Sequence, residues 1–334
     1  MAALPWSIRS LNIVSKSIDP MKILVTANVS AAQVERIRAV SPDLEVVLPK
    51  TLEESEAQLG DTDVILGRFT PEIFRKARSL KWLQTSIAGA DFLLFEKFAQ
   101  SPIPLVTAKG IVGTHLAEQA WALILGLTRG VGLAVRKRQW ETRRAINSMA
   151  SELSGKTLGV VGLGGAGIEV AKRALAFDME VVAIKRTKPS DTTYVSRVWG
   201  PEQLYELLEI SDVVVLCLPL TKRTRGMFNL EAFRHMRPSS LLINVGRGET
   251  VVETALLQAL QEGQIAGAGL DVLPTEPLPD KHPLWDMENV IITPHVAGDS
   301  PLRSERVVDL FCTNLQRFAD GLPLIGLVDK HEGY

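Results

Sequence analysis

The stretch KTLGVVGLGGAGIEVAKRALAF, residues 156–177, decides how the second half of this chain folds. Its first residues form an apolar run that is typical of a buried β-strand, and IEVAKRALAF has the spacing of an amphipathic helix. The glycines between them fit the pattern G-x-G-x-x-G, which turns a strand tightly into a helix. Strand, glycine turn and helix in this order predict the first turn of a dinucleotide-binding domain.

The glycines of this turn have separate physical roles. Gly162 permits the tight turn, Gly164 lets the backbone approach a pyrophosphate, and Gly167 lets the helix pack closely on the strand. Gly165 and Ala166 complete the motif that opens the helical pattern IEVAKRALAF, and the N-terminus of this helix would supply N–H groups for the phosphates. A glycine-rich turn without a ligand is the alternative interpretation, which the flanking strand and helix disfavour.

The next strand, EVVAI, ends in cations where this type of domain usually has an acid. Arg186 stands 19 residues after Gly167, between Lys185 and Thr187. An Asp or Glu in this place would accept the ribose hydroxyls of NAD, whereas two cations and a hydroxyl suit a 2′-phosphate. We therefore expect NADP(H) as the preferred cofactor and keep NAD(H) as the alternative. A solvated charge pair at a strand end is the other interpretation.

Short apolar runs alternate with amphipathic stretches along the whole chain, which predicts an α/β protein with parallel sheets. At 334 residues, two domains are expected. A long helical stretch is predicted over 114–144, and a last helix over 301–319 is expected to pack on the first domain. The predicted strands lie in the runs at 22–27, 64–67 and 80–86, and then at 156–162, 180–184, 212–219, 241–246, 267–272 and 289–294.

Three polar residues follow strands of the second series. Arg247 follows LLINVG, Glu276 follows GAGLDV, and His295 follows NVIITP. Ligands of open α/β sheets bind at the carboxyl ends of the strands, so these side chains should converge on the dinucleotide cleft. Reduction of a 2-oxo acid needs a cation for the carboxylate and carbonyl oxygen and a proton donor near neutral pH. Each residue alone also has a structural explanation, but together they predict a reaction centre.

Composition excludes several other classes of function. The 37 Lys and Arg residues balance 38 Asp and Glu residues, so no field attracts nucleic acid or an anionic membrane. No apolar run is long enough for a membrane span. Cys217 and Cys312 have no neighbours at metal-ligand spacing, so no metal is expected, and a reducing compartment is implied. We expect a cytoplasmic protein, although the acid-poor residues 1–20 leave an organelle open, either chloroplast or mitochondrion.

Over nearly all of its length from Met21, the chain resembles the D-isomer-specific 2-hydroxyacid dehydrogenase family. The segments GLGGAG, LCLPLTKRTRGMFN, LLINVGRGETVVE, GAGLDVLPTEPLPDKHPLW and NVIITPHVAG recur in the family's order and spacing. Within the family, the cations after the second strand and the EPLP-x-x-HPL loop look most like glyoxylate/hydroxypyruvate reductases. The usual fingerprint has a branched aliphatic residue where Ala166 stands here.

The resemblance assigns roles to particular residues. It implies His295 as the acid/base, Glu276 as its partner and Arg247 as the cation that orients a small 2-oxo or 2-hydroxy acid. It also implies that His295 and Arg247 contact the substrate, together with the N–H groups of Ala88 and Gly89. The remaining cofactor contacts that it implies are Leu218, Pro219, Val245, Asp271 and Gly298.

The resemblance also implies a Rossmann cofactor domain, residues 116–297, inserted into a flavodoxin-like catalytic domain made of 21–115 and 298–334. Residues 1–20 are then an N-terminal extension. Hinges are expected near 114–118 and 296–300. The broad apolar face between Leu116 and Val135, through which family members pair, predicts a homodimer.

Two other enzymes and one binding protein are the alternative functions. A formate dehydrogenase would carry Gln in place of Glu276 and a longer N-terminal part. A D-3-phosphoglycerate dehydrogenase would favour an acid after the second strand and an extension beyond residue 334. A dinucleotide-sensing corepressor on the same fold could keep Arg247, Glu276 and His295, so the sequence leaves this binding function open.

Overall fold

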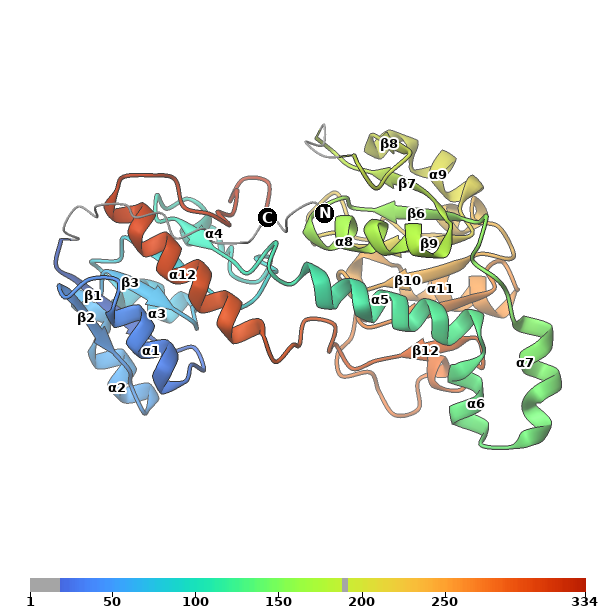
Figure 1. Ribbon diagram of the computed structural model, residues 1–334, viewed down its shortest axis with the longest axis horizontal. Coiled ribbons are helices and arrows are strands. Elements are labelled where there is room, and N and C mark those ends of the chain that lie inside the picture. The colour runs from blue at the N-terminus through green and yellow to red at the C-terminus, as the bar shows by residue number, and fades with distance from the viewer. Residues whose placement is uncertain (1–18, 188–191) are drawn as a thin grey trace. The chain divides into compact units, whose positions relative to one another are not determined.

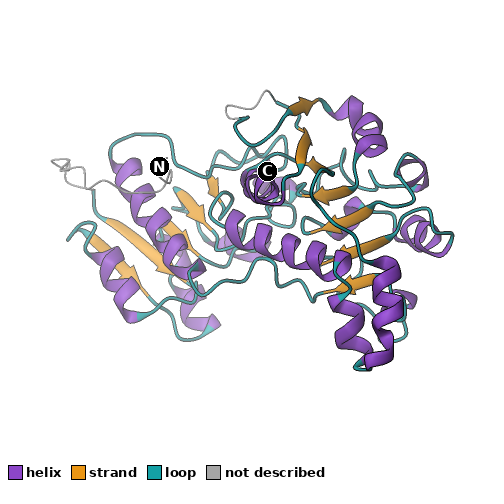
Figure 2. Cartoon of the chain, turned by 45° about the vertical axis from the view of Figure 1, so that its right-hand side comes forward, coloured by secondary structure: helices purple, strands orange, loops and turns teal. Residues whose placement is uncertain are grey.

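A computed structural model describes residues 19–187 and 192–334, which form two compact units, each built on a parallel sheet (Figures 1 and 2). Of the described residues, the first unit contains 19–86, 100–107 and 304–327, and the second contains 87–99, 108–187, 192–303 and 328–334. Of the predicted N-terminal extension, residues 1–18 lie outside the described residues. The predicted fold class, two parallel-sheet α/β domains, is confirmed.

The first unit has the strand order β2-β1-β3-β4-β5, which is the order of flavodoxin-like sheets. Its first helices begin at favourable caps, since Ser30 forms a capping box with Gln33, and Thr70 caps a helix whose first residue is Pro71. The elements are β1 (Met21–Val25), α1 (Ala31–Arg38), β2 (Leu44–Val47), α2 (Leu52–Ala57), η1 (Leu59–Asp61), β3 (Val64–Leu66), α3 (Pro71–Lys76), β4 (Trp82–Gln84), β5 (Leu105–Val106) and α12 (Arg303–Ala319).

Helix α12 packs on this first sheet, as predicted for the last helix of the chain (Figure 1). The ring of Trp82 on β4 lies 5.3 Å from that of Phe311 and 6.1 Å from that of Phe318. The buried amide of Gln84 donates to the carbonyl of Val307 at 2.8 Å. Apolar burial and a satisfied polar contact thus attach α12 to β4.

The second unit has the strand order β12-β11-β10-β9-β6-β7-β8. Its elements are α4 (Glu96–Ala99), α5 (Gly113–Thr128), α6 (Val131–Lys137), η2 (Trp140–Thr142), α7 (Arg143–Met149), β6 (Thr157–Val161), α8 (Gly165–Ala174), η3 (Leu175–Phe177), β7 (Glu180–Ile184), β8 (Arg197–Trp199), η4 (Pro201–Gln203), α9 (Leu204–Ile210), β9 (Val213–Leu216), α10 (Leu230–Arg234), β10 (Leu241–Asn244), η5 (Gly248–Thr250), α11 (Glu253–Gln261), β11 (Gly267–Leu270), η6 (Pro283–Trp285) and β12 (Val290–Ile292).

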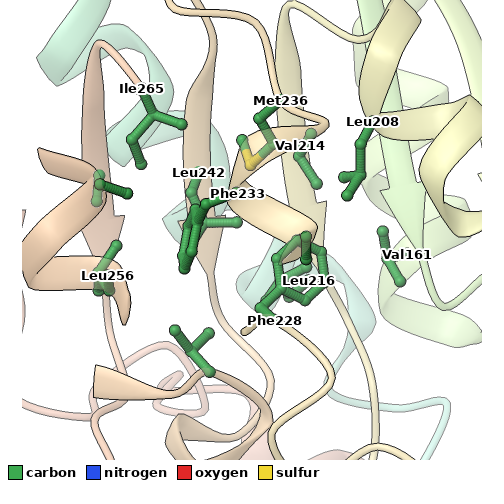
Figure 3. Packing of buried hydrophobic residues seen from close by; sticks show 14 of the residues in the cluster. Val161, Leu208, Val214, Leu216, Phe228, Phe233, Met236, Leu242, Leu256 and Ile265 are labelled. Carbon is green, nitrogen blue, oxygen red and sulfur yellow. The ribbon is translucent and has the colours of Figure 1, made fainter. Parts of the chain in front are cut away.

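Helices cover both faces of this second sheet, so its strands are apolar on both sides. On β9, Val214 and Leu216 point into one cluster with helices α9, α10 and α11, part of which Figure 3 shows. Val213 and Val215 alternate into the other cluster, with α5 and α8. The period-2 alternation of a strand therefore assigns its residues to two separate cores.

The order of the second sheet reverses at β6, which pairs with β7 on one side and with β9 on the other. Chain connections leave β6 and β9 in opposite directions at this switch point, and the crevice outside it is where dinucleotides bind in such sheets. The glycine turn at 162–167 follows β6 directly, and Cys217 and Leu218 follow β9. The fold therefore places the predicted motif at the switch point.

The long helix predicted over 114–144 is wrong as one element. Two left-handed residues, Gly130 with φ of 63° and Arg138 with φ of 52°, divide it into α5, α6 and the η2–α7 segment. Helices α6 and α7 lie side by side and extend from the second sheet (Figures 1 and 2). The prediction also missed β2, β5 and β8, whose two to four residues are too short to show a period.

The homodimer was predicted from the apolar face between Leu116 and Val135, and the exposed part of this region lies on residues 131–149, which we call the arm. The apolar face of α5 is covered within its own unit, but Val131, Val135 and Trp140 expose 53%, 69% and 85% of their surface. Apolar groups gathered in this way are typical of surfaces that bind another chain.

Among the described residues, no helix is long and apolar enough to cross a membrane.

We expect the purified protein to be a dimer at micromolar concentration, and the double variant Val135→Lys, Trp140→Lys to be a monomer, because two charges would have to be buried in the interface. Light scattering after size exclusion measures both masses. Leu175→Lys, which changes an exposed apolar residue outside the arm, is the matched control. A monomeric parent protein, or a double variant that stays dimeric, would show that the arm is not the interface.

Candidate active site

The turn after β6 has the open backbone that a pyrophosphate requires. Gly162 has φ of 104°, and a Cβ there would lie 2.8 Å from the carbonyl oxygen of Cys217. Gly164 precedes α8 without any side-chain cap, and a Cβ added to it would have no atom within 4 Å. Gly164 and Gly165 are also exposed, so the uncapped start of α8 is accessible at Gly164, which fits a phosphate group.

The two other predicted glycine-turn residues hold the helix near the strand. A Cβ at Gly167 would collide with the carbonyl oxygen of Gly162, so only glycine allows this approach. Ala166 is half-buried in the first turn of α8. Burial raises the pKa of the Cys217 thiol, on the facing loop, to about 12. That thiol stays protonated and takes no part in acid/base chemistry at neutral pH.

The predicted cations after β7 have different surroundings. The ammonium of Lys185 donates to the carbonyl of Leu163 at 2.9 Å, so it braces the glycine turn. Arg186 forms an ion pair with Glu332, and its guanidinium lies 5.2 Å from the centre of the Tyr334 ring. Thr187 is exposed. Glu332 was not predicted as a partner of Arg186, because it lies 146 positions further along the chain.

His295 and Glu276 form a hydrogen-bonded pair at the ends of β12 and β11. The imidazole Nδ1 lies 2.6 Å from Oε2 of Glu276, and Oε1 of the same carboxylate accepts the N–H of Leu273 at 2.9 Å. The N–H of Leu273 thus fixes the carboxylate, and the carboxylate orients the imidazole ring. Nε2 is the ring nitrogen that could then contact a reacting molecule. The His295 side chain keeps 49% of its surface exposed, so a ligand can reach it.

A buried carboxylate holds the turn that carries His295. Asp271, 2% exposed, accepts the Thr293 hydroxyl at 2.6 Å and the N–H groups of Val296 and Ala297 at 3.1 and 2.9 Å. The N–H of His295 itself donates to the carbonyl of Asp271 at 2.9 Å, and its φ is 54°. Those donors satisfy the buried charge, and the carboxylate in return fixes a left-handed turn.

Arg247 is presented by a loop that folds on the side chain of Asn244. The Asn244 amide donates to the carbonyl of Arg247 at 3.1 Å and accepts the N–H of Gly246 at 3.1 Å. The guanidinium donates through Nε to Asp91 at 3.2 Å and through Nη1 to the carbonyl of Gly246 at 2.8 Å. Asp91 was not predicted as a partner of Arg247; it lies in the loop 86–91, SIAGAD, which also contains Ala88 and Gly89 and is called the SIAGAD loop below.

Glycines bring the neighbouring loops together around these side chains. A Cβ at Gly246 would lie 2.9 Å from the carbonyl oxygen of Leu218, and one at Gly248 would overlap the backbone of Leu273. A Cβ at Gly89 would overlap the guanidinium of Arg247. The loops after β9, β10 and β11 and the SIAGAD loop are therefore in direct contact, with Gly89 facing the end of Arg247.

The other predicted cofactor and substrate residues lie on these same loops. Val245 is buried, with its side chain in the core, and Leu218 is partly buried against the other core cluster. The carbonyl of Pro219 accepts the hydroxyl of Thr224 at 2.7 Å, while Ala88 and Gly298 are half-buried. Across 19–187 and 192–334, no hydrogen bond or ion pair links Arg247 to the His295–Glu276 pair, and no cluster of metal-ligating residues is found.

Fold and site together define a dinucleotide-binding α/β protein with an oriented histidine and an arginine at the strand ends. Residues 121–297 match the family model described as D-isomer specific 2-hydroxyacid dehydrogenase, NAD binding domain. A glyoxylate reductase of Thermofilum pendens is 34% identical over 290 residues, which cover 84% of this chain and 86% of that protein. The chain belongs to the D-isomer specific 2-hydroxyacid dehydrogenase family, a family of oxidoreductases.

Two further comparisons bear on the activity. The structure of an NADPH-dependent glyoxylate/hydroxypyruvate reductase from Sinorhizobium meliloti, in complex with NADP and sulfate, has a TM-score of 0.78 and 30% identity, and the match covers 94% of this chain and all of that one. A D-3-phosphoglycerate dehydrogenase of Bacillus subtilis is 31% identical over 87% of this chain, but over only 56% of its own length.

We expect Asp271→Asn to destabilise the protein by about 1–3 kcal/mol, because the amide would set an N–H₂ group against a backbone N–H and leave a buried donor unpaired. Urea unfolding followed by circular dichroism measures the loss. Thr293→Val removes the hydroxyl that donates to Asp271 and accepts from Gln119, but it leaves both backbone N–H bonds of the carboxylate intact, so it is expected to destabilise less. Equal stability of Asp271→Asn and the parent protein would contradict the role given to this carboxylate.

Proposed function

We propose that this protein reduces a small 2-oxo acid of the glyoxylate or hydroxypyruvate type to the D-2-hydroxy acid, with His295 as the acid. The observation that carries the proposal is the His295–Glu276 pair, in which a carboxylate holds Nδ1 at 2.6 Å on a side chain that stays 49% exposed. A proton donor fixed in this way is what reduction of a carbonyl group requires.

In this proposal, Arg247 orients the substrate and polarises it. Asp91 and the carbonyl of Gly246 hold Nε and Nη1 of the guanidinium, so its remaining donors are directed by contacts that are already made. Gly89 lies against the end of the guanidinium, and its lack of a side chain leaves backbone N–H groups near the cation. A carboxylate and the neighbouring carbonyl oxygen match a planar guanidinium beside N–H donors.

His295 then delivers a proton to the carbonyl oxygen from Nε2, while Glu276 stabilises the charged ring before the transfer. The bound nicotinamide supplies the hydride for the carbonyl carbon. Residues 162–167, which form the glycine turn and the uncapped start of α8, would hold the pyrophosphate of the cofactor. In the reverse direction, the same ring would accept a proton from the hydroxyl.

D-3-phosphoglycerate dehydrogenase is a second candidate, because the Bacillus subtilis relative has that activity in its name. The glyoxylate reductases among the relatives, and the cations at the end of β7, favour the smaller acid and a phosphorylated cofactor. Rates with glyoxylate, hydroxypyruvate and 3-phosphohydroxypyruvate, followed by cofactor absorbance, distinguish the two. A preference of more than tenfold for the phosphorylated substrate would replace our proposal with the second candidate.

We predict that His295→Ala and Arg247→Ala each lower kcat/KM for glyoxylate by a factor of about 100 or more, as is usual for acid/base residues. Glu276→Gln should lose less, since the ring keeps a hydrogen-bonding partner. Steady-state kinetics measure these losses, and cofactor titrations serve as the control for intact binding. If His295→Ala kept more than a tenth of the activity, another group would have to be the acid.

We also propose NADP(H) as the preferred cofactor, bound through Arg186 at the end of β7. The Arg186 side chain exposes 35% of its surface, and the described residues directly after β7, Lys185 to Thr187, include no acid that could accept the ribose hydroxyls of NAD(H). The Sinorhizobium meliloti reductase, whose complex contains NADP, supports this choice. A guanidinium can make a bidentate contact with phosphate oxygens.

We predict a ratio of kcat/KM for NADPH over NADH of about 10 to 100 in the parent protein, because hydrogen bonds to charged groups contribute about 1.5–3 kcal/mol. Arg186→Asp is expected to reverse this preference, since it repels the phosphate and supplies an acceptor for the ribose. Initial rates with each cofactor give both ratios. A parent ratio below one, or a ratio that Arg186→Asp leaves unchanged, would refute the role of Arg186.

A further inference from the structure

Residues 329–334 form a turn that is closed by hydrogen bonds. The carboxylate of Asp329 accepts the N–H groups of His331 and Glu332 at 2.9 and 3.1 Å. Its backbone exchanges bonds with the far end, as Gly333 donates to the carbonyl of Asp329 at 2.8 Å and Asp329 donates to that of Tyr334 at 3.1 Å. We call residues 329–334 the closing turn.

The closing turn is attached to the rest of the second unit on two sides. Lys330 donates to the carbonyl of Phe98 at 3.0 Å, and its ammonium lies 3.7 Å from the centre of the Phe98 ring. Burial lowers the pKa of Lys330 to about 8. A Cβ at Gly333 would lie 3.7 Å from the methyl group of Thr221, two residues after Pro219. The turn therefore lies beside the loop that follows β9.

This placement directs two side chains of the closing turn at Arg186. Glu332 forms an ion pair with the guanidinium, and the ring of Tyr334 lies 5.2 Å from its central carbon. Arg186 and Glu332 expose 35% and 37% of their side chains, so water and ions reach the pair and its contribution is small. Such a pair can be exchanged for a better partner without unfolding the site.

We propose that Glu332 weakens the preference for NADP(H), because its carboxylate holds Arg186 and competes there with the 2′-phosphate of NADP(H). This inference rests on the proposed role of Arg186 in cofactor binding. A 2′-phosphate carries more charge than a carboxylate and offers more acceptor oxygens, so it displaces Glu332, but with an affinity lowered by the broken ion pair. NAD(H) has no group that needs Arg186 and does not compete with Glu332.

The test is a set of equilibrium titrations of the full chain with NADP⁺ and with NAD⁺, followed by calorimetry. Glu332→Gln removes the charge and keeps the shape, and we expect it to tighten NADP⁺ binding about two- to fivefold, the range for a half-exposed ion pair. NAD⁺ binding should be unchanged. The gain should shrink at high salt, which screens the pair. Glu262→Gln, on an exposed residue after α11, is the matched control.

A second variant and a double variant separate this inference from the proposed function. Lys330→Met releases the closing turn from Phe98, so it should also tighten NADP⁺ binding. In an Arg186→Gln background, Glu332→Gln should have no effect on either cofactor. If Glu332→Gln tightened NAD⁺ as much as NADP⁺, or acted equally without Arg186, competition would be refuted.

The outcomes with Arg186→Gln show which statement fails. If this variant binds NADP⁺ at least tenfold more weakly than the parent while Glu332→Gln changes nothing, the competition is refuted and the cofactor role of Arg186 stands. If Arg186→Gln binds NADP⁺ as well as the parent does, the cofactor role fails and the inference fails with it. The bisphosphate 2′,5′-ADP, compared with 5′-ADP, repeats the comparison without the nicotinamide.

Discussion

The pairing of β6 between β7 and β9 is the constraint on which the second unit depends. Because all strands run parallel, their carboxyl ends meet at one edge, and the connections diverge where the order reverses. The divergence leaves the start of α8 uncovered, and the neighbouring strands β10, β11 and β12 deliver their loops to the same edge. A strand order thus brings together residues that are far apart along the chain.

Close packing of these loops sets the geometry of the side chains. At Gly246 and Gly248, any side chain would meet the backbone of the next loop. Hydrogen bonds then fix the loops that the glycines allow to approach. The Asn244 side chain holds the loop that carries Arg247, and the Asp271 carboxylate holds the turn that carries His295. Arg247 and His295 are therefore each held by a neighbouring polar side chain, which is the arrangement that the proposed preorganised site requires.

Much of this could be predicted from the sequence, since the signals were local. The strand, glycine turn and helix at 156–177 have a short-range pattern, and apolar runs before Arg247, Glu276 and His295 placed these residues at strand ends. Segments that depend on distant partners could not be predicted. The role of Glu332 depends on its ion pair with Arg186, which lies far away in the sequence. The helix breaks at Gly130 and Arg138 are a separate case, because they come from left-handed backbone conformations inside an otherwise helical pattern.

The two cysteines have a consequence for how the protein responds to oxidants. Burial raises the pKa of Cys217 to about 12 and that of Cys312 to about 11. Thiolate is the form that peroxides and alkylating reagents attack, and at neutral pH it is present here in only about one molecule in ten thousand or fewer. Both thiols thus stay protonated at neutral pH, and a cysteine introduced on the surface would accept a spectroscopic label with little background.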